Sequence, residues 1–174
     1  MNHRAHVARL CRWLLTCSPI VFLLGWFAAP LPQRSPLPEP IRAVQYFQPD
    51  ANLRTFWNNL DLARLPADFD LLHSGGFNAI ILMVPWGEFQ TSVQPVAFDE
   101  AMFTLLQTVI AVAQRHGLWV ILRVGTHELL PRDAQGGDYW AGAVLTNEQE
   151  FSAYRALFYR IARETRQYPR MLYF

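Results

Sequence analysis

The spacing of hydrophobic residues changes several times along the chain from residue 43 onward. Every position from 79 to 84 is apolar, which is typical of a strand buried on both faces of a parallel sheet. In 99–116 the apolar residues recur every three or four positions, which predicts an amphipathic helix. The whole pattern predicts strands alternating with helices. The predicted strands are 43–47, 78–85, 118–124 and 171–174, and the predicted helices are 62–74, 99–116 and a third that begins at Thr146 or Asn147.

Residues at the helix ends support these limits. Asp99 can cap the second helix and Gly117 stops it, while Gly75 and Gly76 follow the first helix where a left-handed cap is needed. The third helix carries a basic stripe, which we interpret as a solvated outer face rather than a surface for an anionic partner. Its members are Arg155, Arg160, Arg163, Arg166 and Arg170.

An alternation of this kind fits either a doubly wound sheet or half of an eight-stranded barrel. No glycine-rich phosphate loop follows the first predicted strand, which counts against a dinucleotide-binding fold. We therefore expect an α/β domain that forms the N-terminal half of a TIM (β/α)8 barrel, with about four βα units.

The first forty residues differ from the rest of the chain. Residues 1–12 carry three arginines, residues 13–29 carry no charge, and no acidic residue precedes Glu39. This pattern predicts a transmembrane signal anchor at 13–29, with 1–12 cytoplasmic and the remainder extracytoplasmic; secretion is the alternative. Residues 30–42 contain five prolines and are expected to form a stiff linker. The partial barrel domain should then occupy 43–174.

Composition excludes several classes of protein. The 15 basic and 14 acidic residues give a net charge of +1, which does not indicate a nucleic-acid-binding protein. Every basic residue is an arginine, and the absence of lysine excludes a Walker A phosphate loop and a pyridoxal Schiff base. The only cysteines are Cys11 and Cys17, so the folded part has no cysteine zinc cluster. We expect no cofactor and no metal ion.

Candidate chemistry follows the predicted strands, because the C-terminal ends of barrel strands face the active site. Trp86 and Glu88 come after the second strand, and His127 and Glu128 begin a long stretch after the third. Arg123 lies inside the third strand, where an unpaired charge is costly, so it should reach the barrel mouth or pair with an acid. Aromatic rings beside carboxylates suit carbohydrate binding, which makes these five residues candidate substrate contacts. The alternatives are a packing role for Trp86 and a solvated loop charge for Glu88.

Three segments resemble motifs in the N-terminal half of barrel glycoside hydrolases. They are GGFNAI at 75–80, VPW at 84–86 and GLWVILR at 117–123. The resemblance covers roughly 43–174 and is to family 35 β-galactosidases and their cellulase-like and family 42 relatives. It implies retaining hydrolysis of O-glycosidic bonds in the full-length protein. In those families the acid/base glutamate lies just past strand four and the nucleophile near strand seven, so the resemblance places neither catalytic carboxylate in this chain. Pro131 stands where those β-galactosidases have a sugar-contacting glutamate.

The preferred interpretation is the N-terminal part of a membrane-anchored, extracytoplasmic glycoside hydrolase with a carbohydrate substrate. The other half of the barrel would come from a C-terminal continuation or a partner chain. An alternative is a non-catalytic, membrane-tethered carbohydrate-binding or assembly module. A third is a different periplasmic α/β enzyme whose sheet only mimics the motifs.

Overall fold

A computed structural model describes residues 35–38, 40–126, 130–134 and 147–174. The chain divides into two units, Met1–Pro30 and Leu31–Phe174, and all the described residues belong to the second. The anchor predicted at 13–29 and the basic segment before it therefore lie outside the described residues and stay predictions. No helix within the described part is long and apolar enough to cross a membrane.

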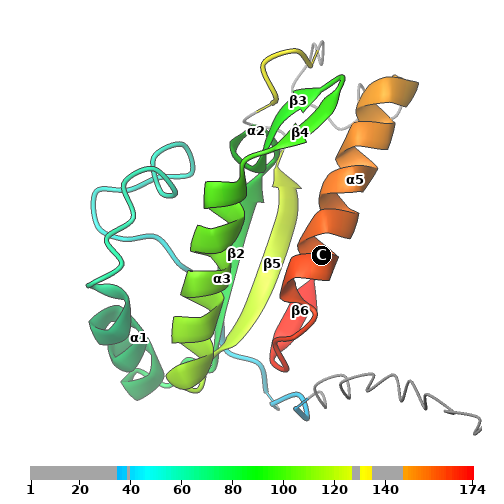
Figure 1. Cartoon of the computed structure of the whole chain (residues 1–174). Helices are drawn as coiled ribbons and strands as arrows, with labels where there is room; N and C mark the ends of the chain where they lie inside the picture. Colours follow the sequence, from blue (N-terminus) through cyan, green and yellow to red (C-terminus); the bar gives the residue numbers. More distant parts are fainter. Residues whose placement is uncertain (1–34, 39, 127–129, 135–146) are drawn as a thin grey trace, which may run out of the picture. The chain divides into compact units, whose positions relative to one another are not determined.

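The domain is built on a four-stranded parallel sheet. Its strands are β1 (Ala43–Gln45), β2 (Ala79–Pro85), β5 (Trp119–Thr126) and β6 (Met171–Tyr173), paired in the order β1-β2-β5-β6. Figure 1 labels the last three of them. Neighbours in the sheet are thus consecutive in the chain among these four strands. This order agrees with a barrel segment, whereas a doubly wound sheet reverses direction at a switch point.

Three long helices cover one face of this sheet: α1 (Leu65–Ser74), α3 (Glu100–Arg115) and α5 (Glu148–Thr165) (Figure 1). Ile80, Leu82 and Val84 of β2 pack into the large core with buried residues of all three helices. The alternate positions on the other face form a separate cluster made of strand residues only, including Trp119 and Ile121. In the described part of the chain the crossover helices lie on one side of the sheet, which is therefore singly wound. This confirms the expected α/β architecture of a partial barrel.

Local chemistry explains where the helices begin and end. The carboxylate of Asp99 accepts from the backbone N–H groups of the second and third residues of α3, at 2.9 and 3.2 Å. Asn147 caps α5 in the same way, which decides between the two starts that the sequence allows. The first helix begins at Leu65, three residues later than expected, because Asp61 caps a turn at Ala63 and Pro66 suits a first helical turn.

Two short elements after β2 were not predicted. The single turn α2 (Trp86–Phe89) leads into a hairpin formed by β3 (Gln90–Val93) and β4 (Val96–Phe98). The hairpin strands have the sequences QTSV and VAF, and neither shows the alternation or the long apolar run that is typical of a strand. The hairpin lies at the same end of the sheet as the C-terminal ends of β2 and β5 (Figure 1).

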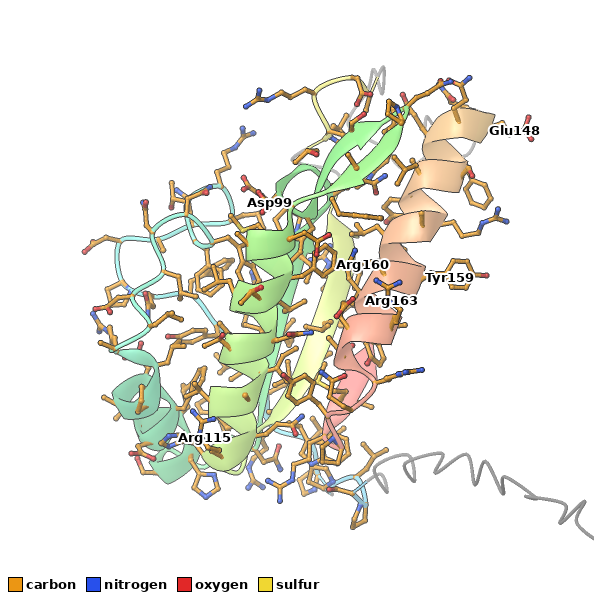
Figure 2. All side chains as sticks on the ribbon, in the orientation of Figure 1. Asp99, Arg115, Glu148, Tyr159, Arg160 and Arg163 are labelled. Carbon is orange, nitrogen blue, oxygen red and sulfur yellow. The ribbon has the colours of Figure 1, made fainter. Side chains whose placement is uncertain are left out.

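Arg160 joins α5 to α3. Its guanidinium donates to Glu100 at 3.0 Å and to Glu164 at 2.9 Å, and it stacks 4.7 Å from the ring centroid of Phe103 (Figure 2). Unlike its exposed neighbour Arg163, Arg160 is therefore not part of the solvated stripe expected from the sequence. Its stem and charge are both used in holding two helices together.

Replacing Arg160 by Ala should lower the free energy of unfolding by about 2 kcal/mol, because the charge-assisted hydrogen bonds to Glu100 and Glu164 and the contact with Phe103 are lost. Arg163→Ala is the matched control and should change it by no more than about 0.5 kcal/mol, since that side chain is 61% exposed. Urea denaturation measures both values. Equal effects of the two substitutions would contradict the assignment of Arg160 as the link.

Candidate active-site mouth

The C-terminal edge of the sheet brings together three segments that are distant in the sequence. Residues 48–64 follow β1, α2 and the hairpin follow β2, and residues 130–134 belong to the segment after β5. Since parallel strands end at the same edge, these segments lie at that edge, and hydrogen bonds join them there. Figure 1 shows the hairpin beside the C-terminal ends of β2 and β5. We call this edge the mouth.

Two buried side chains hold the segment after β1 in place. The side-chain amide of Gln48 donates to the backbone carbonyl of Asp61 at 2.8 Å and accepts from its N–H at 2.8 Å, which closes the segment on itself. The indole N–H of Trp57 donates to the carbonyl of Met83 near the end of β2, also at 2.8 Å. This segment is therefore pinned to the neighbouring strand and does not depend on a ligand for its position.

Glu88 lies at the mouth as predicted, and it has a partner that the sequence did not indicate. The side-chain amide of Asn58 donates to one carboxylate oxygen of Glu88 at 3.2 Å. Asn58 is exposed and Glu88 is half-buried. The contact joins the segment after β1 to the segment after β2, and the 30 residues between the two positions leave no local sequence signal for it.

Trp86 does not present a ring face to the mouth. Its side chain is fully buried, its indole N–H donates to the side chain of Gln90 at 2.9 Å, and its ring packs edge-on against Tyr154. A sugar needs an exposed ring face on which to stack, so the predicted substrate contact does not fit this arrangement. The packing alternative accounts for the contacts that Trp86 makes with the described residues.

Arg123 is exposed near the C-terminal end of β5, beside Met83 in the sheet register. It lies two positions after Ile121 and thus on the sheet face without helices. No ion pair joins Arg123 to an acidic residue anywhere in the described part of the chain. Its guanidinium is free to meet a group at the mouth. His127 and Glu128, the other two candidates, lie outside the described residues.

The end of β5 is held against α5 at a glycine. Gly125 has a φ of 74°, and its carbonyl accepts from the hydroxyl of Tyr154 at 2.9 Å. A Cβ at this position would lie 2.1 Å from that hydroxyl oxygen. Only glycine meets both requirements, so residue 125 directs the chain from the strand into the segment that carries the predicted sugar contacts.

Asp133 attaches the segment after β5 to the hairpin. Its carboxylate accepts from the N–H of Val93 at 2.9 Å, the hydroxyl of Ser92 at 2.8 Å and the N–H of Gln94 at 3.2 Å. The bond from Val93, together with those from Ser92 and Gln94, lowers the pKa of Asp133 below its usual range. The hairpin that the sequence did not predict thus positions part of the mouth.

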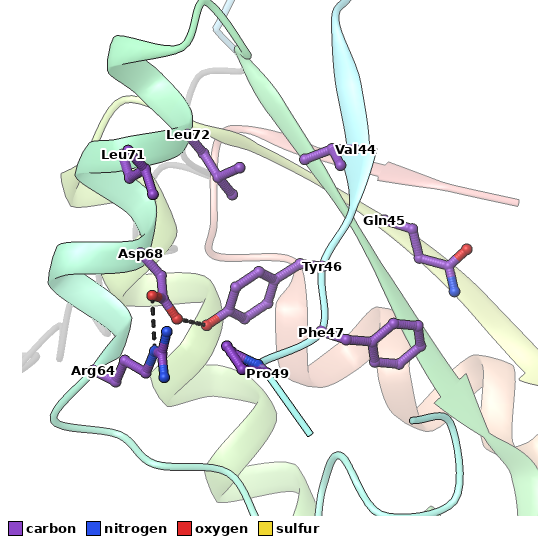
Figure 3. A pocket seen from close by; sticks show the side chains of 9 residues that line it. All are labelled: Val44, Gln45, Tyr46, Phe47, Pro49, Arg64, Asp68, Leu71 and Leu72. Carbon is purple, nitrogen blue, oxygen red and sulfur yellow. Dashed lines mark hydrogen bonds and ion pairs between the residues drawn. The ribbon is translucent and has the colours of Figure 1, made fainter. Parts of the chain in front are cut away.

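A hollow of about 290 Å³ lies on the outer side of β1, against α1 (Figure 3). The hydroxyl of Tyr46 donates to Asp68 at 2.7 Å, and Arg64 donates to the other oxygen of the same carboxylate at 3.0 Å. Burial first, and then the bond to Asp68, raise the pKa of Tyr46 far above its usual value. The phenol therefore remains protonated and serves as a structural donor. Leu71 and Leu72 give the hollow an apolar wall at the uncovered edge of the sheet.

No group of three histidine, cysteine, aspartate or glutamate side chains that could hold a metal ion occurs among the residues that the structure describes.

Solved structures of glycoside hydrolases share this fold. A GH5_18 protein from Bifidobacterium longum subsp. longum aligns with 75% of this chain at a TM-score of 0.63 and 17% identity. A GH5_18 variant from Streptomyces cattleya, solved in complex with Manβ1-4GlcNAc, aligns with 75% of this chain at a TM-score of 0.63 and 18% identity. An exo-β-1,4-mannosidase from Opitutaceae bacterium strain TAV5 aligns with 76% of this chain at a TM-score of 0.64 and 17% identity. No protein-family model and no curated protein sequence matches the chain.

These likenesses show the fold alone, that of part of a (β/α)8 barrel. The chain spans about a third or less of the matched structures, 32% of the two GH5_18 proteins and 23% of the mannosidase. The neighbours are glycoside hydrolases, as the sequence motifs imply. The family 5 label of the GH5_18 proteins differs from families 35 and 42, which the resemblance named together with cellulase-like relatives.

Gly125→Ala should destabilise the domain by about 3 kcal/mol or more, because the new methyl group collides with Tyr154 and the backbone keeps a left-handed conformation. Gly76→Ala is the control: φ is 87° there, but nothing lies within 4 Å of the added carbon. It should cost only the conformational strain, roughly 1–2 kcal/mol. Chemical denaturation measures the free energy of unfolding of both variants. An equal loss at the two glycines would mean that Tyr154 does not pack tightly on the end of the strand.

Asp133→Asn should lower the melting temperature at neutral pH. The difference in melting temperature between wild type and variant should disappear in acid. The folded-state pKa of Asp133 is lowered, so its contribution is present above the unfolded pKa of about 4 and disappears as the pH falls through the folded value. Other carboxylates titrate in both proteins and cancel in the difference. Calorimetry of wild type and variant from pH 7 downward tests this, and a difference that persists unchanged at the lowest pH would refute it.

Proposed function

We propose that this chain is the N-terminal part of a glycoside hydrolase whose complete barrel hydrolyses β-linked O-glycosides with retention of configuration. The observation that carries the proposal is the singly wound sheet, with consecutive parallel strands and all three long helices on one face. Its likeness to solved glycoside hydrolases supports the same conclusion. The chain's contribution is to bind and orient the sugar at the mouth.

The groups at the mouth suit a neutral, hydroxyl-rich ligand. Glu88 offers acceptors, Asn58 offers both a donor and an acceptor, and Arg123 offers donors only. His127 and Glu128 follow β5 in the sequence and remain part of the proposed site. The two catalytic carboxylates, which retaining hydrolysis requires about 5–5.5 Å apart, would come from the later strands of the full-length protein.

Uncovered apolar flanks at both sheet edges support completion by further βα units. Leu71 on α1 is 71% exposed beside β1, and Phe158 on α5 is exposed on the side of the helix that faces away from α3. Tyr173 and Phe174 are exposed at the β6 edge. Apolar surface beside an open parallel strand is typical of a sheet that other elements cover. The same flanks are what favours the second candidate, an assembly or carbohydrate-binding module completed by another chain.

Manβ1-4GlcNAc is the first substrate to test, because GH5_18 variants from Bifidobacterium longum and Streptomyces cattleya were solved with it. β-Galactosides come second, since the sequence motifs resemble family 35 enzymes. The proposal places the enzyme outside the cytoplasm on an anchor at 13–29, an inference from the sequence pattern.

The full-length protein should cleave one of these β-linked disaccharides, with the β-anomer of the released sugar appearing first in time-resolved proton NMR. Activity should sediment with membranes if residues 13–29 are an anchor. Binding without cleavage, measured by calorimetry, would replace the proposal with the non-catalytic module. Neither binding nor cleavage across the panel would overturn both candidates.

A further inference from the structure

We propose that Asn58 and Glu88 form a preorganised pair that recognises adjacent hydroxyl groups of a neutral sugar ring, which makes Asn58 a specificity-determining residue. This inference rests on the proposed function and identifies a recognition element within it. It is carried by three features of the mouth: the contact itself, the support beneath it and the hydrogen-bonding capacity that the pair leaves unused.

The contact joins two independent segments at the mouth. Asn58 comes from the segment after β1 and Glu88 from α2, directly after β2, and their side chains meet at 3.2 Å. β1 and β2 are neighbours in the sheet, so both residues lie above the same pair of strands. In a barrel this is the edge at which substrate binds.

An aromatic contact lies directly beside the pair along both segments. Trp57 precedes Asn58 and Phe89 follows Glu88, and these two rings pack edge to face with their centroids 5.1 Å apart. Trp57 and Phe89 are both buried, and the indole N–H of Trp57 is bonded to the end of β2. The backbones that carry the polar pair are therefore fixed before any ligand arrives, which lowers the entropic cost of binding.

The pair keeps hydrogen-bonding capacity for a ligand. One oxygen of Glu88 and the carbonyl oxygen of Asn58 accept no hydrogen bond from any residue within the described ranges, and one N–H of the Asn58 amide is also free. No arginine pairs with Glu88 in this part of the chain. Two acceptors beside a donor match a pair of sugar hydroxyls, each of which both donates and accepts. An unneutralised carboxylate also disfavours anionic sugars.

Asn58→Asp tests the pair by placing a second carboxylate against Glu88. In the full-length enzyme with Manβ1-4GlcNAc as the probe, we expect kcat/KM to fall about tenfold or more, because the like charges separate and the bridging N–H is lost. Asn59→Asp is the matched control. Asn59 is the next residue and is also exposed, and its described contact is a backbone bond to Thr55, so this variant should stay within about twofold of wild type.

Monodeoxy analogues of the mannosyl unit separate recognition from a merely structural effect. Wild type should lose about tenfold or more in kcat/KM on the analogue that lacks a recognised hydroxyl, and Asn58→Asp should lose little further on that analogue. An unchanged deoxy penalty in the variant, or equal activity of the Asn58 and Asn59 variants, would overturn the pair while leaving the hydrolase intact. A wild-type protein that neither binds nor cleaves any β-linked disaccharide would overturn the proposed function and the pair with it.

Discussion

Right-handed crossovers between consecutive parallel strands are the constraint on which the rest of the structure depends. Each crossover returns over the same side of the sheet, so α1, α3 and α5 lie side by side on one face. This leaves the other face to strand residues alone and gathers every strand-to-helix connection at one edge. The mouth, the uncovered edges and the single helical layer are three consequences of this one rule.

In the described part of the chain, three aromatic residues support the mouth from below and do not line it. Trp57, Trp86 and Phe89 are all buried, and each is tied to a neighbour by a hydrogen bond or a ring contact. Tyr154 extends this layer to the end of β5 through its bond to Gly125. Aromatic rings beside carboxylates in the sequence predict sugar contacts, but in these cases the rings fix the backbone from which shorter polar groups project.

The regular elements could be predicted because burial imposes a pattern that is visible within a few residues. The apolar run at 79–84 and the capped helix after Asp99 each contain their own evidence. The hairpin at 90–98 could not be predicted in this way, because neither of its strands has a clear apolar pattern and its tip is held by Asp133, about forty residues further along. Arg160 was misassigned for a related reason: a helical wheel shows which side of α5 is polar but not that α3 lies against it.

The same distinction between local and long-range signals applies to the two residues of the candidate site. Glu88 could be found from its position after a strand, since that depends on the sequence order alone. Asn58 could not, because its significance depends on a contact across 30 residues and on the fixed position of Trp57 beside it. An exposed polar residue in a loop carries no signal in the sequence that it has a fixed position. Here the buried aromatic neighbour fixes the backbone position of the exposed residue. A loop residue gains binding specificity from the rigidity of the residue adjacent to it, and that rigidity is set by the core.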